Sequence, residues 1–193
     1  SNINERVKAW LEQDHEEEYT HVLITDISVD EEVGKELNSL SIEGKMKVNL
    51  LDHHETANWL NKYQWARVES ESNGEKNSGT DLLYEFLTTN MGFEANVLCS
   101  EFVELVRSYD TWDWAHTDNQ KAKELSDLFG IQGLQAFEEN MIQKLKEGII
   151  FSDEDQEAIE IEKEKRKIYM KRKKSKLIKL KVHDYDVGAV FAE

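Results

Sequence analysis

The sequence has 193 residues, with 24 Lys and Arg against 40 Asp and Glu, a single cysteine and no proline. This length fits one domain with an extension, or two small domains. An ordinary chain of this length would contain roughly ten prolines, so collagen-like, mucin-like and other proline-rich proteins are excluded. The single Cys99 cannot form an internal disulfide framework.

The start of the sequence shows no basic stretch followed by an apolar one, as a secretion signal would. The longest apolar runs, such as residues 22–24, are far too short to cross a bilayer. We therefore expect a soluble, cytoplasmic protein.

The charge is unevenly distributed along the chain. The net charge is -16, yet residues 163–181 contain 11 basic residues and one acidic residue, which leaves 13 basic and 39 acidic residues in the other 174. An acidic body repels phosphates unless its carboxylates hold divalent cations. Binding of a phosphate compound to the acidic part of the chain therefore requires metal ligands in this sequence.

The first third of the chain predicts an α/β fold, with a parallel sheet flanked by helices. Apolar residues at helical spacing predict a helix over residues 3–13 and a crossover helix over residues 29–40. Continuous apolar runs over residues 20–28 and 45–54 predict strands that are buried on both faces. A third strand is predicted over residues 63–70, followed by a polar loop over residues 71–77.

From Ser78 onward the pattern is mostly helical. Helices are predicted from residue 78 to about 87, from 97 to 106, from 120 to 130 and from 133 to 147. The stretch from Asp153 to about Leu180 has acidic residues first and basic residues last, which complements a helix dipole and predicts a long connector helix. Residues 186–192 predict the beginning of a further strand.

Acidic and imidazole side chains stand at the ends of the first two predicted strands. Asp26 ends one strand, and Asp52, His53 and His54 end the next. Ligand sites form at the carboxyl ends of parallel strands, and mixed oxygen and nitrogen ligands suit Mn²⁺, Zn²⁺ or Fe²⁺. Taken separately, Asp26 fits a helix N-cap and the histidines fit ordinary polar residues. Their combination favours a metal site.

Four segments in a fixed order carry a resemblance to a known family. They are LITDIS with Asp26, LLDHHETA with Asp52 to His54, SGTDLLYEFL from Ser78, and SYDTWDW with Asp110. This order resembles the DHH phosphoesterase superfamily, which includes RecJ nucleases, NrnA-type oligoribonucleases, cyclic-dinucleotide phosphodiesterases and family II pyrophosphatases. The resemblance implies a DHH-type α/β catalytic domain over residues 1–150, a charged connector helix over 151–182 and the start of a C-terminal DHH-associated domain over 183–193.

The resemblance also implies roles for individual residues. Asp26 would bridge two Mn²⁺ ions, with His53 and Asp110 as further metal ligands. His54 would be the catalytic residue that faces the scissile phosphate, and Asp52 would hold the histidine pair through a hydrogen bond, as ligated imidazoles generally require. Ser78 opens a predicted helix, whose backbone N–H groups can receive phosphate, or it is an ordinary N-cap.

Trp112 and Trp114 follow Asp110 closely. They could stack a nucleobase, although burial in a core or an interface is the favoured interpretation.

One family motif has no counterpart in this sequence. The first metal motif, of the type His-x-x-x-Asp-x-Asp-Gly, should precede Asp26, and it is absent from residues 1–25. The expectation is therefore a domain that is incomplete at its N-terminus, with an incomplete two-metal site and little activity on its own.

The resulting hypothesis is a Mn²⁺-dependent phosphoester hydrolase in which a metal-activated water attacks phosphorus. Short oligonucleotides or nucleotide second messengers are the expected substrates, and pyrophosphate or polyphosphate is the alternative class. The alternative function is a non-catalytic DHH-like interaction module whose basic helix contacts a partner or nucleic acid. No membrane partner is expected, and a homodimer is one alternative for the assembly.

Overall fold

The computed structural model describes residues 3–13, 19–44 and 47–190 and divides into two compact units, residues 1–123 and 124–193. The first unit is built on a three-stranded parallel sheet with the order β1 (His21–Thr25), β2 (Lys47–Asp52) and β3 (Ala66–Val68). Val22 pairs with Val48, and Leu50 pairs with Ala66. The three predicted parallel strands are confirmed, although β3 is shorter than expected.

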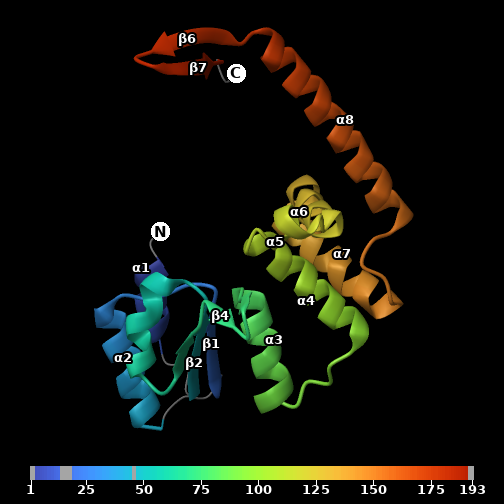
Figure 1. Cartoon of the computed structure of the whole chain (residues 1–193). Coiled ribbons are helices and arrows are strands. Elements are labelled where there is room, and N and C mark those ends of the chain that lie inside the picture. The colour runs from blue at the N-terminus through green and yellow to red at the C-terminus, as the bar shows by residue number, and fades with distance from the viewer. Residues whose placement is uncertain (1–2, 14–18, 45–46, 191–193) are drawn as a thin grey trace. The chain divides into compact units, whose positions relative to one another are not determined.

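Helix α2 (Glu31–Ile42) forms the predicted crossover between β1 and β2. The side chain of Asp30 caps it by accepting a hydrogen bond from the backbone N–H of Val33 at 3.0 Å. Its buried face, with Val33 and Leu37, packs into a core with Leu50 and Leu60. Each such buried side chain contributes about 1.5–3 kcal/mol. In Figure 1, α1 (Ile3–Leu11) and α2 lie on one side of the sheet and α3 (Gly79–Asn90) lies on the other.

A 3₁₀ helix, η1 (Glu55–Lys62), follows β2, and a small hairpin follows β3. The hairpin consists of β4 (Glu71–Ser72) and β5 (Glu75–Lys76), which pair antiparallel. Asn73 and Gly74 form its turn and both have positive φ, which Asn and Gly tolerate best. The prediction of a plain polar loop over residues 71–77 is therefore wrong.

The rest of the first unit is helical, as predicted. Helix α4 (Val97–Asp110) follows α3, and the short α5 (Asp113–Thr117), which was not predicted, comes next. Helix α6 (Gln120–Gln132) begins in the first unit and continues into the second.

The second unit contains the remainder of α6, α7 (Leu134–Glu147), α8 (Asp153–Ser175) and a hairpin of β6 (Ile178–Val182) and β7 (Tyr185–Ala189). Ion pairs join α8 to α6, with Lys163 bound to Glu124 at 2.8 Å and Arg166 bound to Asp127 at 2.9 Å.

The predicted long helix ends at Ser175, not near Leu180. Apolar residues alternate with polar ones from Ile178 onward, which is the period of a strand. The predicted terminal strand is present as β7, while residues 191–193 lie outside the described residues. Among the helices that the structure describes, none is long and apolar enough to span a membrane.

Candidate metal centre

Asp26 follows the last residue of β1 and continues its ladder. Its backbone N–H donates to the carbonyl of Leu51 at 3.0 Å. Its φ is 60°, a left-handed conformation that Asp adopts more readily than most residues. The carboxylate is about half exposed at this edge of the sheet. A strained residue at a strand end is typical of a functional position.

Asp52 ends β2 and organises the histidine pair that follows it. It is fully buried, and its Oδ1 accepts hydrogen bonds from the backbone N–H of His53 at 2.8 Å and of His54 at 3.3 Å. The same oxygen lies 2.7 Å from Nδ1 of His54. Because a carboxylate only accepts, Nδ1 of His54 carries the proton and Nε2 is the nitrogen left for another partner.

The hydrogen bond to Asp52 raises the pKa of His54 above its ordinary value, against the opposing effect of burial. The imidazole of His54 is half exposed, so its free nitrogen is accessible from solvent. This arrangement suits a side chain that faces a bound phosphate.

Two predicted site residues, Asp26 and Asp110, converge on a third, His53. Its Nε2 lies 3.1 Å from Oδ1 of Asp26 and 3.3 Å from Oδ2 of Asp110, the last residue of α4. Two ligand atoms that each lie about 2.1 Å from one cation, at right angles, are about 3 Å apart. The spacing of the three side chains therefore matches that of ligands around one ion, and burial raises the pKa of the Asp110 carboxyl.

The chemistry of the donor set also fits a divalent cation. One ligand atom from each of Asp26, Asp52, His53 and His54 lies within 4.8 Å of the others. Within the described residues, Oδ2 of Asp52 is buried and has no hydrogen-bond partner. A buried carboxylate oxygen without a donor is costly, and a cation or a bound water would satisfy it. Together with Asp110, these residues could hold a divalent metal.

Gly79 places the start of α3 directly against Asp26. A Cβ atom added to Gly79 would contact the Cβ of Asp26 and lie only 2.8 Å from its Cα. Only a glycine allows this approach without displacing the backbone of Asp26. Sequence analysis did not assign this contact to Gly79, and the only signal for it was a glycine at a predicted helix start.

Ser78, predicted as a substrate contact, is the N-cap of α3. It is 1% exposed and forms a capping box with Asp81, in which the Ser78 hydroxyl accepts from the backbone N–H of Asp81 at 3.3 Å. The same hydroxyl also donates to Oδ1 of Asp81 at 2.6 Å. This position gives Ser78 a structural role at the helix start. A substrate contact through Ser78 stays a prediction, and it would require this capping interaction to open.

Arg107 is a further residue that sequence analysis missed. Its guanidinium is mostly buried and donates to Asp113 at 2.7 Å, to the carbonyl of Lys76 at 3.0 Å and to Glu104 at 2.7 Å. The hydrogen bond to Glu104 is the main cause that raises the pKa of Arg107. Arg107 thus ties the loop after Asp110 to α4 and to the β4–β5 hairpin.

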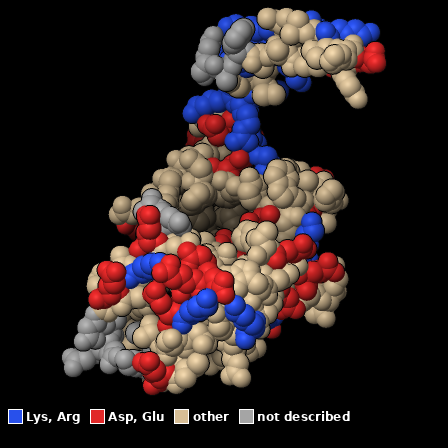
Figure 2. Space-filling model, turned by 90° about the vertical axis from the view of Figure 1, so that its left-hand side faces the viewer, with Lys and Arg blue, Asp and Glu red and all other residues tan. Residues whose placement is uncertain are grey.

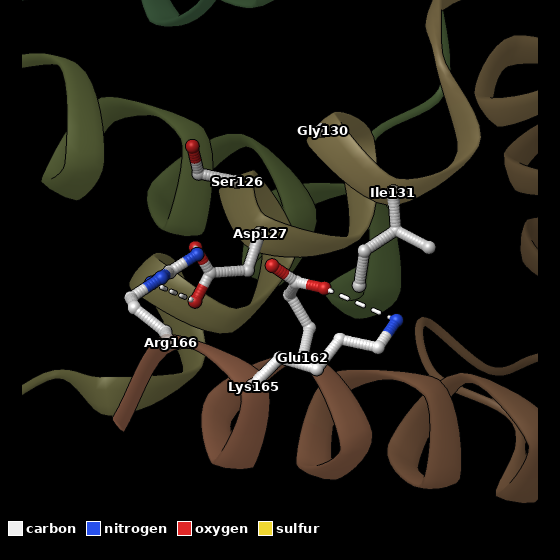
Figure 3. Close-up of a pocket in the computed structure, with 7 residues that line it drawn as sticks. All are labelled: Ser126, Asp127, Gly130, Ile131, Glu162, Lys165 and Arg166. Carbon is white, nitrogen blue, oxygen red and sulfur yellow. Dashed lines mark hydrogen bonds and ion pairs between the residues drawn. The ribbon is translucent and has the colours of Figure 1, made fainter. Parts of the chain in front are cut away.

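A separate hollow of about 430 Å³ lies in the second unit between α6 and α8. Figure 3 shows that its charged side chains pair with one another, Arg166 with Asp127 and Lys165 with Glu162. Paired charges leave little to bind a charged ligand, so the site at the sheet edge is the better candidate.

A curated relative matches the whole chain that carries this site. Over 197 aligned residues the chain is 38% identical to the oligoribonuclease NrnB of Bacillus subtilis (strain 168). This similarity is consistent with membership of the DHH phosphoesterase superfamily. The alignment covers all of this chain and 49% of NrnB, so the chain spans about half the length of the curated relative that it matches. No family model and no solved structure matches the chain.

The similarity to NrnB confirms the resemblance to DHH phosphoesterases. The structure brings together Asp26, His53 and Asp110, with His54 and Asp52 beside them. Their roles as metal ligands, catalytic residue and positioning residue stay predictions.

Proposed function

We propose that this chain forms the metal-binding part of a Mn²⁺-dependent phosphodiesterase that hydrolyses short oligoribonucleotides. The observation that carries the proposal is the convergence of Asp26 and Asp110 on His53 beside the exposed His54, in a DHH chain similar to an oligoribonuclease. The name of NrnB supports the substrate class. The mixed oxygen and nitrogen donors support a transition metal such as Mn²⁺.

Asp26, His53 and Asp110 would hold the metal. When bound, a divalent cation supplies Lewis-acid catalysis, because it lowers the pKa of a water and stabilises negative charge on the phosphate. The cation would also offset the mutual repulsion of Asp26 and Asp110, which approach the same imidazole nitrogen within 3.3 Å.

His54 would orient the scissile phosphate through its exposed imidazole. Asp52 holds Nδ1 of that ring, so the ring cannot turn without breaking a 2.7 Å hydrogen bond. With both ring nitrogens protonated, the exposed Nε2–H would be a fixed donor to the phosphate and would stabilise the charge that develops as the phosphodiester is attacked. Asp52 would act through His54 and through the backbone of His53, not by contact with the substrate.

The experiment is hydrolysis of a ribonucleotide dimer and pentamer by the full-length natural protein, with and without Mn²⁺ after removal of divalent ions by EDTA. Calorimetric titration of Mn²⁺ is run in parallel on Asp26→Asn and His53→Ala. We expect both variants to bind Mn²⁺ at least ~10-fold more weakly and to lose hydrolysis almost completely.

Asp184→Asn is the matched control, because Asp184 is an exposed carboxylate at the turn of the β6–β7 hairpin. It should leave binding and hydrolysis unchanged. Mn²⁺ affinity in His53→Ala equal to that of the natural protein would contradict the proposed ligand set. Faster hydrolysis of pyrophosphate than of the dimer would contradict the proposed substrate class.

A further inference from the structure

Trp112 lies next to the candidate metal centre and is largely exposed. Asp110 reaches to within 3.3 Å of His53, and Trp112 follows two residues later. Two residues span at most about 7 Å, so the Cα atom of Trp112 lies within this distance of the Cα atom of Asp110. Trp112 is 66% exposed, so it does not lie in a core of this chain, one of the two placements that the sequence interpretation favoured.

The backbone holds this tryptophan in an unfavourable conformation. Its φ is 64°, in the left-handed region that bulky residues rarely adopt. The N–H of Trp112 donates to the carbonyl of Tyr109 at 3.2 Å, and Arg107 holds the next residue, Asp113, at 2.7 Å. The turn is therefore anchored on both sides while the indole itself is left in solvent. Neighbouring contacts thus maintain a strained backbone at a side chain that is not buried. Backbone strain of this kind indicates that the side chain has a function.

Two further aromatic rings extend the surface at Trp112. The ring of Trp114 lies 6.3 Å from that of Trp112 with 30° between their planes. The ring of Tyr109 lies 6.0 Å from that of Trp114 with only 14° between their planes. Trp114 is half-buried and Tyr109 is 40% exposed. The three rings therefore form one cluster, in which Trp112 is the most exposed member.

We infer that Trp112, supported by Trp114 and Tyr109, is the stacking platform for the base of the nucleotide whose phosphate binds at Asp26, His53 and Asp110. This inference rests on the proposed function. A nucleotide carries its base and its phosphate on one ribose, so a phosphate at the acidic site brings the base to a surface that adjoins it. Stacking does not depend on the identity of the base, so the platform selects nucleotides over other phosphates without selecting a sequence.

The test compares two probes that share a phosphate and differ in the base, adenosine 5′-monophosphate and ribose 5-phosphate. Their affinities for the full chain are measured by calorimetry with saturating Mn²⁺. Trp112→Asn removes the ring and keeps a residue that tolerates positive φ. Trp112→Phe keeps a smaller ring. Circular dichroism establishes that each variant is folded.

Stacking on one aromatic side chain is worth about 5- to 150-fold in affinity. We expect the natural chain to bind adenosine 5′-monophosphate more tightly than ribose 5-phosphate by a factor in this range. Trp112→Asn should remove this difference without changing the affinity for ribose 5-phosphate. Trp112→Phe should keep part of it.

Phe93→Ala is the matched control, because Phe93 is another exposed aromatic residue and lies beyond the far end of α3. Its N–H donates to the carbonyl of Leu87, which is eight residues and about 12 Å along α3 from Gly79. This variant should behave like the natural chain.

The outcomes separate the inference from the proposed function. Equal affinities for the two probes in the natural chain, or an unchanged difference in Trp112→Asn, would overturn the platform and leave the phosphate site intact. Failure of both probes to bind in the presence of Mn²⁺ would overturn the proposed function and the platform with it.

Discussion

At the first residue of α3, the missing side chain of Gly79 allows the helix to lie against Asp26. In Gly79→Ala the new methyl group would meet the Cα of Asp26 at 2.8 Å, so one of the two backbones must move. We expect a loss of about 1–3 kcal/mol in the free energy of unfolding. The displaced carboxylate should also bind Mn²⁺ about 10-fold more weakly. Urea unfolding and calorimetric titration measure the two effects.

Gly130→Ala is the control for this substitution. Gly130 lies inside α6, and nothing stands within 4 Å of the Cβ it would gain. Alanine in a helix interior is about 0.5–1 kcal/mol more favourable than glycine, so this variant should be slightly more stable and bind Mn²⁺ normally. Normal Mn²⁺ binding by Gly79→Ala as well would show that the close approach does not position Asp26.

The candidate site was predictable only where a residue's role follows from its neighbours in sequence. Asp26 and His53 stand directly after apolar runs, and parallel strands bring such ends to one edge. Gly79 and Arg107 are different. Gly79 lies against Asp26, and Arg107 donates to the carbonyl of Lys76. In both pairs the two residues are tens of positions apart in the sequence. No local pattern encodes contacts of this kind. The exposure of Trp112 was not predictable either, because residue type alone gives neither the conformation of its backbone nor the exposed fraction of its ring.

At the scale of elements, α8 is fixed to α7 by a buried ion pair between Lys144 and Asp155. Burial alone would raise the pKa of Asp155, but hydrogen bonds from Lys144 and from the backbone of Ser152 outweigh it and lower the pKa below 3.8. A carboxyl whose pKa falls on folding contributes stability above its unfolded pKa. That stability is lost as the pH drops through the folded value. We therefore expect the stability that the pair contributes to decline only below about pH 3.8.

Asp155→Ala should abolish this contribution and leave Lys144 buried without its carboxylate. We expect a loss of about 3–5 kcal/mol at neutral pH, measured by urea unfolding followed by circular dichroism. Asp153→Ala is the control, because Asp153 is exposed in the same first turn of α8. Removal of its interaction with the helix dipole should cost no more than about 1 kcal/mol. Equal destabilisation of the two variants would show that the ion pair adds nothing beyond the dipole.

Elements were predictable where hydrophobic periodicity is sustained. The strands β1 and β2 and the crossover α2 each contain enough apolar residues to show their period. The β4–β5 hairpin has two residues in each strand, too few for a period, so only its Asn73-Gly74 turn could have revealed it. The predicted end of α8 was wrong because the last turns of this helix are nearly all basic. They show no apolar periodicity whose end would mark the end of the helix.

Over the whole molecule, charge is segregated along the chain. Figure 2 shows basic side chains along the stretch that leads from α8 into the β6–β7 hairpin, and acidic side chains gathered on other parts of the surface. Residues 163–181 hold 11 of the 24 basic residues in a protein whose net charge is -16. A long polyanion gains affinity from such a basic segment, whereas a dinucleotide bound at the proposed metal centre would depend on the cation. The two modes of binding should therefore respond differently to changes in the basic segment.

Replacement of Lys171, Lys174, Lys179 and Lys181 by Gln removes four exposed positive charges from this segment. We expect weaker binding of a 20-nucleotide single-stranded RNA. The slope of the logarithm of the binding constant against the logarithm of the salt concentration should become shallower by about 0.7 for each phosphate that the protein no longer neutralises.

The same exchange at Lys35, Lys47, Lys121 and Lys146 is the control. It changes the net charge equally outside the segment and should have a much smaller effect. Fluorescence anisotropy over a series of salt concentrations measures both variants, and equal behaviour would assign the RNA affinity to net charge alone. Affinity for a ribonucleotide dimer with Mn²⁺ should remain unchanged in both, because a dimer has too few phosphates to gain much affinity from the release of counterions.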